Sequence, residues 1–194
     1  MTQTIIKDGT GQGKAAKVDN KHRLATKTVS QSELISATQS GNAYTLSTGL
    51  INLTSGDESA VLYLKSNENS DLVVAKILTQ VGLSNATGDI IRRDIIAPTT
   101  GTLITDATPA LVANLNTGSS NSLDATVYVG AEGKTVGGGV FTGLSIWHQS
   151  QTIESDIGFI VPKGAVLGLS FEPPTGNTSL NIIIEVIVYL LDEV

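Results

Sequence analysis

After the first 42 residues, apolar side chains recur mainly at every second position, in short segments that turn signals separate. This alternation is typical of β-strands, whose side chains point to opposite faces in turn. In Leu72–Val81, for example, we expect Val73 and Ile77 on one face and Lys76 on the other. No long segment of helical periodicity intervenes. The pattern therefore predicts an all-β sandwich or barrel and excludes a sheet of alternating strands and helices.

The turn signals are clusters of Gly, Pro, Ser, Asn and Asp, and they delimit about eight to ten antiparallel strands. The expected strands are Tyr44–Leu53, Ser59–Ser66, Leu72–Val81, Asp89–Ala97, Ala125–Val129, Val140–His148, Ile157–Val161, Ala165–Phe171 and Ser179–Leu191. A possible capping box at Ser30–Glu33 predicts a short helix through Thr38. We expect Pro98–Asp124, rich in Thr, Ser, Asn and Gly, to be a long loop that projects from the sandwich.

The N-terminal segment differs from the body in both pattern and charge. It has little hydrophobic periodicity and several turn signals, so we expect residues 1–29 to be an extended arm and residues 30–194 to be the β-domain. Thr4–Lys7 and Arg23–Val29 are strand-like pieces of this arm. Residues 1–30 hold six basic and two acidic residues, a net charge of +4, whereas the remainder holds six basic and 16 acidic, a net charge of −10.

A basic segment of this kind binds either nucleic acid or an acidic protein surface. The arm has no aromatic side chain on which a base could stack. We therefore expect a protein surface, which includes that of a neighbouring copy of the chain, and no nucleic acid partner.

The last expected strand is apolar on both faces. One face runs without interruption from Leu180 to Leu190 at every second position, and the opposite face is still mostly apolar. Because a strand of a free antiparallel sandwich usually has one wet face, the second face is expected to be covered. The arm, a second subunit or the chain's own loops are the alternatives. We expect a subunit interface that contains Ile183, Ile187, Tyr189 and Leu191.

Motifs that suggest nucleotide binding do not have the required context. Gly133-Lys134-Thr135 matches the end of a phosphate-binding loop, but Tyr128 stands where the first glycine belongs, and Gly137-Gly138-Gly139 follows instead of a helix. Gly11–Ala16 has the form of a dinucleotide fingerprint, but it lacks the buried strand before it and the helix after it. Neither segment predicts a cofactor.

Catalytic and metal sites also lack support. The chain contains no cysteine, which excludes thiol catalysis and zinc sites built on sulfur. His148, Ser150 and Asp156 lie close together in sequence, but no nucleophile elbow accompanies them. Asn67–Asp71 vaguely resembles a calcium loop without its central glycine or its distal glutamate. We expect no enzyme activity, no cofactor and no metal.

The sequence also bears on membrane and glycan partners. The longest apolar run, Ile182–Leu191, is interrupted by Glu185 and is too short to span a bilayer, so no membrane partner is expected. Glycan binding is possible, but the few aromatic residues lie mostly on expected strands and are expected in the core.

Three segments resemble structural proteins of tailed-phage particles. The arm "IIKDGTGQGKAAKVDNKHRLATKTVS" is similar to the N-terminal segment of phage virion proteins in which "DGTG" precedes "AKVD" and "RL". The segment "GNAYTLSTGLINLTSGDESAVLYLKSNENSDLVV" adds small polar turns and a strand that begins near an Asn-Glu-Asn turn. The C-terminal "VPKGAVLGLSFEPPTGNTSLNIIIEVIVYL" is similar to the end of jelly-roll capsid-decoration domains, where a Pro-x-Gly turn leads into the closing strands.

The resemblance implies a jelly roll that forms a homotrimer on the outer capsid surface and joins neighbouring capsid subunits. Its partners are then the major capsid protein and itself, and it is made in the host cytoplasm before it joins the virion. The arm residues expected to make the contact are Ile5, Ile6, Lys7, Lys14, Lys17, Lys21, Arg23 and Lys27. A head-fibre or tail-associated protein that binds a receptor or glycan shows the same features and stays the alternative.

Overall fold

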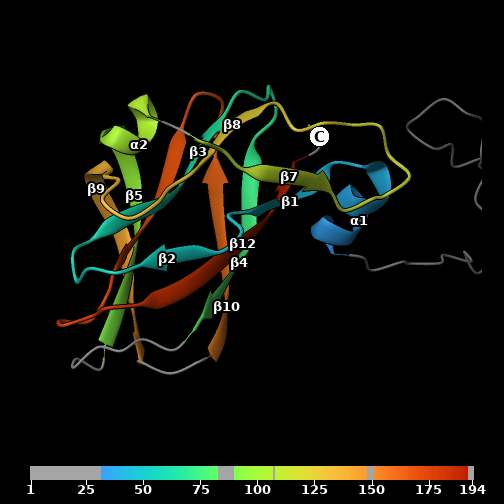
Figure 1. The fold of residues 1–194 in the computed structure, drawn as a ribbon. Helices are drawn as coiled ribbons and strands as arrows, with labels where there is room; N and C mark the ends of the chain where they lie inside the picture. Colours follow the sequence, from blue (N-terminus) through green and yellow to red (C-terminus); the bar gives the residue numbers. More distant parts are fainter. Residues whose placement is uncertain (1–31, 83–89, 107, 148–150, 192–194) are drawn as a thin grey trace, which may run out of the picture. The chain divides into compact units, whose positions relative to one another are not determined.

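The computed structural model describes residues 32–82, 90–106, 108–147 and 151–191, with the backbone alone described for 140–147 and 151. From Glu33 on, the described residues belong to one compact unit. The predicted arm lies outside the described residues, so its form stays a prediction. The described part contains twelve strands and two short helices (Figure 1).

The elements follow one another in chain order. They are α1 (Glu33–Ser40), β1 (Ala43–Ser47), β2 (Ile51–Leu53), β3 (Ser59–Ser66), β4 (Leu72–Val81), β5 (Ile90–Thr100), α2 (Thr102–Thr105), β6 (Thr108–Pro109), β7 (Leu111–Asn114), β8 (Ala125–Val129), β9 (Gly137–Trp147), β10 (Gln151–Val161), β11 (Val166–Glu172) and β12 (Leu180–Leu190).

The strands form two antiparallel sheets packed face to face. The first sheet has the order β10-β4-β12-β1-β7, with β2 paired to the end of β12, and the second has the order β6-β8-β3-β11-β5-β9. Without the short added strands, the two sheets read β10-β4-β12-β1 and β3-β11-β5-β9. Each sheet thus alternates strands from the two halves of the chain, as two interleaved Greek keys do. This is the strand order of a jelly roll, and it confirms the predicted fold class.

The hydrophobic core lies between the two sheets. Its side chains come from alternate positions of nearly every long strand, and Leu46, Ile77, Phe171 and Ile184 are fully buried there. Removing each such side chain from water contributes about 1.5–3 kcal/mol to folding. Because the pairings are non-local, the strands acquire their buried faces only when the whole sandwich assembles.

A cation is also buried between the sheets. Arg93 of β5 has an exposed fraction of 3%, and burial lowers its pKa. Its Nη1 donates to Thr79 Oγ1 of β4 at 2.9 Å and its Nη2 donates to Ser155 Oγ of β10 at 3.2 Å. Its Nε has no hydrogen-bond partner in the described structure. The two hydroxyl contacts join β5 to the facing sheet.

Several local predictions were correct, and others were wrong for physical reasons. β3, β4 and β8 have the predicted bounds. The predicted strand Tyr44–Leu53 is two strands, because the chain bends at Gly49, whose φ of 66° suits glycine. The predicted loop Pro98–Asp124 instead holds α2, β6, β7 and the end of β5. These elements were missed because their pairing partners are distant in sequence.

The predicted faces of β4 were wrong in part. The register of β4 against β12 shifts between Ile187 and Val188, so this pair of strands contains a β-bulge. A bulge inserts one residue and reverses the faces beyond it. Ile77 therefore points into the core as part of its buried cluster, whereas Val73 belongs to a separate cluster beneath α1.

Candidate interaction surface

We call the outward side of the sheet β10-β4-β12-β1-β7 the outer face. A helix covers it at one end, and its other end is open. On β12, the even-numbered side chains from Ile182 to Val188 are fully buried in the core, so the odd-numbered ones point outward. The strand register arranges the outward residues in rows across the sheet. Rows that are two residues apart are separated by about 7 Å.

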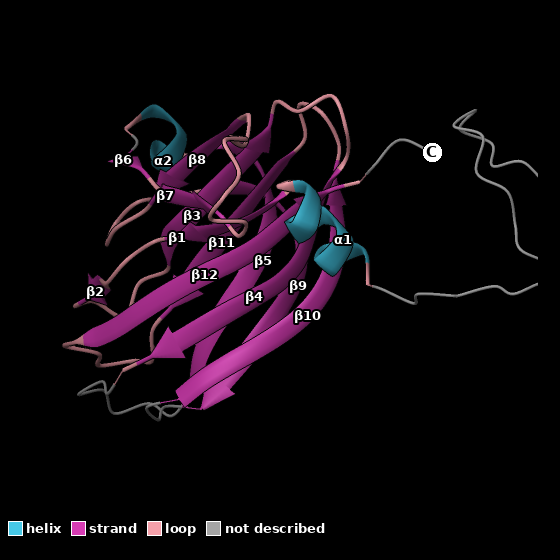
Figure 2. Cartoon of the chain, turned by 90° about the vertical axis from the view of Figure 1, so that its right-hand side faces the viewer, coloured by secondary structure: helices cyan, strands magenta, loops and turns pink. Residues whose placement is uncertain are grey.

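Helix α1 covers the first row. Ala37 of α1 is buried against Ala43, Val73 and Tyr189, which stand side by side in the sheet. Tyr189 Oη donates a hydrogen bond to Glu33 Oε2 at 2.9 Å, and the pKa of Tyr189 is raised by burial and then by this carboxylate. An eight-residue helix is marginal by itself, so packing on the sheet stabilises it. Figure 2 shows α1 across one end of the sheet.

The middle rows are charged. In one row Lys76 lies beside Ile187 and contacts the carboxylates of Glu154 and Asp156, with an Nζ–Oδ1 distance of 3.7 Å to Asp156. The hydrogen bond to Glu154 is the main cause of the raised pKa of Lys76. Glu185 stands in the next row, in register with Leu78 and Glu154 across β4 and β10. One lysine and three carboxylates give these rows a net charge of −2.

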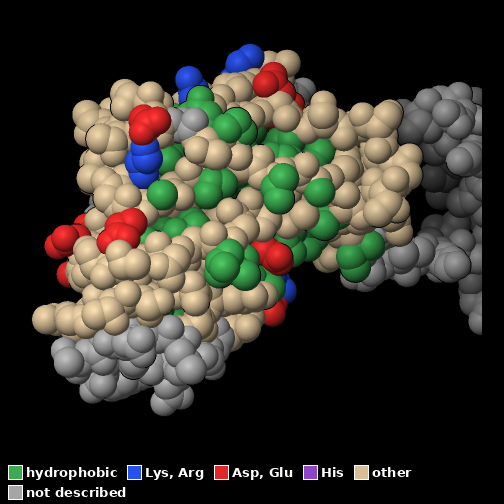
Figure 3. Space-filling view, viewed as in Figure 1, with side chains coloured by type: hydrophobic (Ala, Val, Ile, Leu, Met, Phe, Trp, Pro, Cys, Tyr) green, Lys and Arg blue, Asp and Glu red, His purple; other side chains and the backbone are tan. Residues whose placement is uncertain are grey.

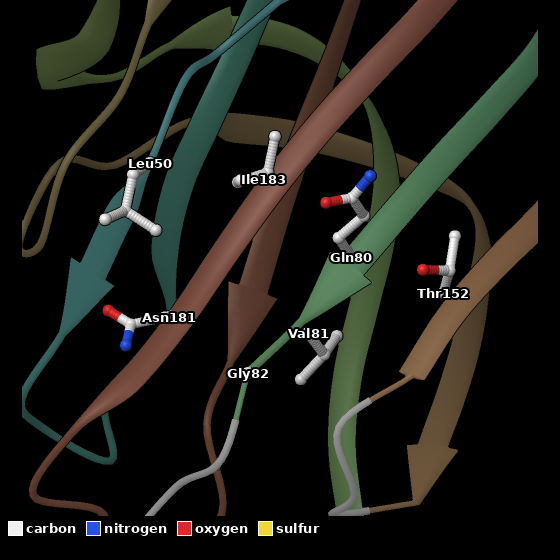
Figure 4. A pocket seen from close by; sticks show the side chains of 7 residues that line it. All are labelled: Leu50, Gln80, Val81, Gly82, Thr152, Asn181 and Ile183. Carbon is white, nitrogen blue, oxygen red and sulfur yellow. The ribbon is translucent and has the colours of Figure 1, made fainter.

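The far end of the outer face is an open hollow of about 530 Å³. It has both polar and apolar side chains, and Figure 4 shows them on β12, β4, β10 and the segment before β2. It is lined by Leu50, Gln80, Val81, Gly82, Thr152, Asn181 and Ile183. Leu50 is 69% exposed, and it lines the hollow together with the partly exposed Ile183. We call this feature the hollow.

Exposed large hydrophobic residues concentrate in the same layer of the molecule. Of the six in the described residues, four belong to α1 or to the sheet that carries the outer face, and a fifth, Leu50, lies in the segment before β2. They are Ile35, Leu50, Leu111, Val112 and Ile160; the sixth is Ile90 on the other sheet. Figure 3 shows hydrophobic side chains scattered over the side of the sandwich where β2 and β7 lie, which is seen at right angles to the outer face. Leu111 and Ile160 lie on the outer face by their register with Ser47 and Val73, so this face keeps apolar surface that a partner can cover.

We call the outer side of the other sheet the closed side, because α2 covers it over β3 and β8, where the structure describes the side chains. There α2 places Leu103, which is fully buried, over Ala60 and Tyr63, and the ring of Tyr63 stacks on Tyr128 with centroids 5.7 Å apart. The polar part of this side is paired internally. Arg92 binds Asp94 through Nε–Oδ1 and Nη2–Oδ2 contacts of 2.9 Å each, as a two-point ion pair.

The structure distributes the four residues of the predicted subunit interface along the outer face. Tyr189 and Leu191 lie in the cluster beneath α1, Ile187 lies in the first charged row, and Ile183 lies in the hollow. Only part of the predicted face is thus open. A second subunit on this face stays a prediction, as does the role of the eight arm residues, which lie outside the described residues.

Leu50 was not expected from the sequence as a surface residue. The only available signal was its neighbour Gly49, which indicates a turn within an apparently continuous apolar run.

The segment that resembled a phosphate-binding loop is part of the closed side. The backbone N–H of Leu103 donates to Thr135 O at 3.1 Å, and Lys134 forms an ion pair with Asp106. Strand β9 follows at Gly137, so no helix N-terminus is present to hold a phosphate. The lysine therefore pairs with the residue that follows α2 and not with a phosphate.

The described side chains offer little that is typical of other binding sites. In this part of the chain no three residues of the types His, Asp and Glu are grouped so that they could hold a metal ion. None of its helices is long and apolar enough to cross a membrane. Tyr44, Tyr63, Tyr189 and Phe171 are buried, so these aromatics do not provide an exposed platform for a sugar.

Comparison with known proteins gives similarity at the level of solved structures. No family model matches the chain, and no curated protein matches it. The structure of Tomato aspermy virus is similar with 11% identity, a TM-score of 0.30 and coverage of 88% of this chain and 84% of that chain. Cocksfoot mottle virus follows with 10% identity, a TM-score of 0.23 and coverage of 76% and 95%.

Desmodium yellow mottle tymovirus is also similar, with 11% identity, a TM-score of 0.20 and coverage of 91% of this chain and 99% of that chain. TM-scores this low carry no argument about function. The jelly-roll assignment rests on the strand order of this chain.

Proposed function

We propose that the chain is a structural protein of a virus particle that binds the outer capsid surface as a decoration protein and has no enzymatic activity. Its partners are the major capsid protein and further copies of itself, arranged as a homotrimer. The basic arm, from Ile5 to Lys27, makes the contacts with acidic groups of the partners. Ile183 and Ile187 contribute to the contact between copies.

The observation that carries this proposal is twofold. The outer face keeps exposed apolar residues, and the arm and the body have opposite net charges. A jelly roll serves many functions, which include capsid and lectin domains, so the fold alone does not decide. The outer face leaves apolar surface uncovered, as a protein that works in an assembly does. The tailed-phage resemblance of the arm and of the C-terminal segment selects the virion as that assembly.

The mechanism is one of many weak contacts. An extended arm adds backbone hydrogen bonds to a strand edge, and its lysines pair with carboxylates. Each contact alone is weak, but an oligomer engages several points of a regular lattice at once, and multivalency strengthens the sum.

Quantitative mass spectrometry of purified particles tests the position. Hundreds of copies per particle are expected of a protein that covers the lattice. A handful of copies indicates a vertex, fibre or tail position and favours the receptor-binding alternative, and absence from the particle refutes the proposal.

A rebinding experiment tests the arm. Particles made without the gene are incubated with the full chain and sedimented. Lys14→Glu with Lys17→Glu should reduce the bound fraction strongly, because two attractions become repulsions. Lys65→Glu with Lys163→Glu makes the same change of charge on the body and should leave most binding intact. Equal losses for the two pairs mean that only net charge matters and that the arm has no special role.

A further inference from the structure

The hollow combines an apolar site with a nearby acidic group. Ile183 lies in the hollow and Glu185 stands two residues along the same strand, on the same face. The two side chains are therefore about 7 Å apart along β12. Lys76 is already paired with Glu154 and Asp156, whereas the described structure shows no ion pair for Glu185. A ligand for this site carries an apolar group and a cation with the same separation.

An extended peptide presents such a pair when an aliphatic residue and a basic residue are two positions apart, because both then point to one side. Within residues 1–31 only two segments place Ile, Leu, Val or Met two positions from Lys or Arg. These are Ile5 with Lys7, and Lys27 with Val29. The arm thus offers two candidates for the hollow.

The two candidate segments differ in how far they can extend from the body. Val29 is three residues from Ser32, where the described chain begins, and three extended residues span only about 10 Å. Ile5 is 27 residues from Ser32, and an extended chain of that length spans up to about 90 Å. The first segment therefore has by far the longer reach, and it is the better candidate to extend to the hollow of another molecule. The arm's net charge of +4 also complements the net charge of −2 on the middle rows of the face.

We propose that Thr4–Lys7 of a neighbouring copy occupies the hollow, with Ile5 against Leu50 and Ile183 and with Lys7 beside Glu185. The choice of a neighbouring copy rests on the proposed function, in which the protein works as an assembly. Ile6 points away from the hollow in this arrangement and stays available to a capsid partner. The arm thereby links one copy to the next.

Sedimentation velocity of the full chain, without particles, tests the inference. The wild type should self-associate, and added salt should weaken the association. Ile5→Asp and Ile183→Lys should each weaken association at least tenfold. The matched controls are Ile6→Asp, on the opposite side of the arm segment, and Ile90→Lys, which is 50% exposed on the other sheet. Both controls should associate like the wild type, and equal losses in the controls overturn the inference.

Charge exchange tests the pairing itself. Lys7→Glu and Glu185→Lys should each weaken association, and the two changes together should restore it. Failure of the double variant to recover shows that these two side chains do not meet. Thermal unfolding of each variant, followed by circular dichroism, confirms that the β-domain is intact before association is compared.

A mixing experiment establishes which molecule supplies the arm. The Ile5→Asp chain keeps an intact hollow, and the Ile183→Lys chain keeps an intact arm. An equimolar mixture should associate more strongly than either variant alone at the same total concentration. If the mixture is no stronger than the variants alone, the arm does not pass between copies. If either variant alone associates like the wild type, another surface joins the copies. Either result overturns the inference.

These measurements are independent of the proposed function. A chain that binds particles without self-association through the arm refutes this inference alone. A chain that exchanges arms but does not bind particles refutes the proposed function alone.

Discussion

The outer sides of the two sheets of the sandwich are covered in different ways. On the β3-containing sheet, α2 seals the apolar part with the fully buried Leu103, and the polar part is paired internally by Arg92 and Asp94. On the β12-containing sheet, α1 seals one end with Ala37, and the other end remains an open hollow beside Leu50. Both sides have a short helix, and among the described residues the outer face also carries the hollow.

On the proposed function, the difference between the two sides points to the outer face as the side that faces a partner. A monomer gains stability by covering apolar surface, so a side that stays partly uncovered has a cost that an assembly recovers. The open side also carries unequal charge, with three carboxylates around Lys76. On the proposed function, the closed side contributes to folding and the open side contributes to association.

The largest effect is expected on the closed side. Leu103→Ala should lower the free energy of unfolding by about 2–4 kcal/mol, because it leaves a cavity beneath α2. Leu111→Ala is the same substitution at a side chain that is 73% exposed, and it should change stability by less than about 0.5 kcal/mol. Urea unfolding of both variants measures the difference. Similar losses at the two sites contradict the distinction between the sides.

An intermediate effect is expected where α1 meets the sheet. Tyr189→Phe should cost about 1 kcal/mol at neutral pH, because the hydrogen bond to Glu33 is lost. The pKa of Tyr189 is raised in the folded protein, so its contribution is fully present below its ordinary pKa and is lost as the pH rises through the folded value. The stability of the wild type should therefore fall more than that of Tyr189→Phe above about pH 10.

Unfolding free energies at neutral and alkaline pH check this prediction. Glu33→Gln is the control, because it removes the carboxylate charge but keeps an acceptor for the tyrosine. Its alkaline loss should be smaller than that of the wild type. Parallel pH profiles for all three proteins show that Tyr189 does not hold α1.

The smallest effect on stability is expected in the hollow. Leu50→Ala should change the free energy of unfolding by less than about 0.5 kcal/mol, since the side chain is largely exposed in the single chain. Differential scanning calorimetry at low protein concentration measures this change. A loss above about 1 kcal/mol shows that the hollow is already filled within the monomer, and the two sides are then alike.

Much of the fold was predictable because the signals are local. The period-two pattern located β3, β4 and β8 correctly and gave the all-β class. The missed elements were short ones, such as α2 and β7, whose stability comes from contacts with distant strands. The faces of β4 were predicted only in part, because a bulge depends on the partner strand and not on the composition of β4 itself.

The candidate surface was predictable to a smaller degree. The doubly apolar pattern of the last strand predicted that its second face is covered, and the subunit interface expected there stays a prediction. It did not reveal that α1 covers Tyr189 while Ile183 stays in a hollow, and it contained no sign of Leu50 as part of that hollow. The buried Arg93 was likewise unforeseen, because its hydroxyl partners come from β4 and β10.

The sequence by itself determined the strand periodicity, the apolar second face of the last strand and the opposite charges of arm and body. These properties belong to single segments and to their composition. Only the tertiary structure decided that the strands alternate as a jelly roll, that one sheet is closed by α2 and that the other keeps a hollow at one end. The reason is that a surface of one strand is covered by segments that are distant in the chain, and these segments meet only when the sandwich forms.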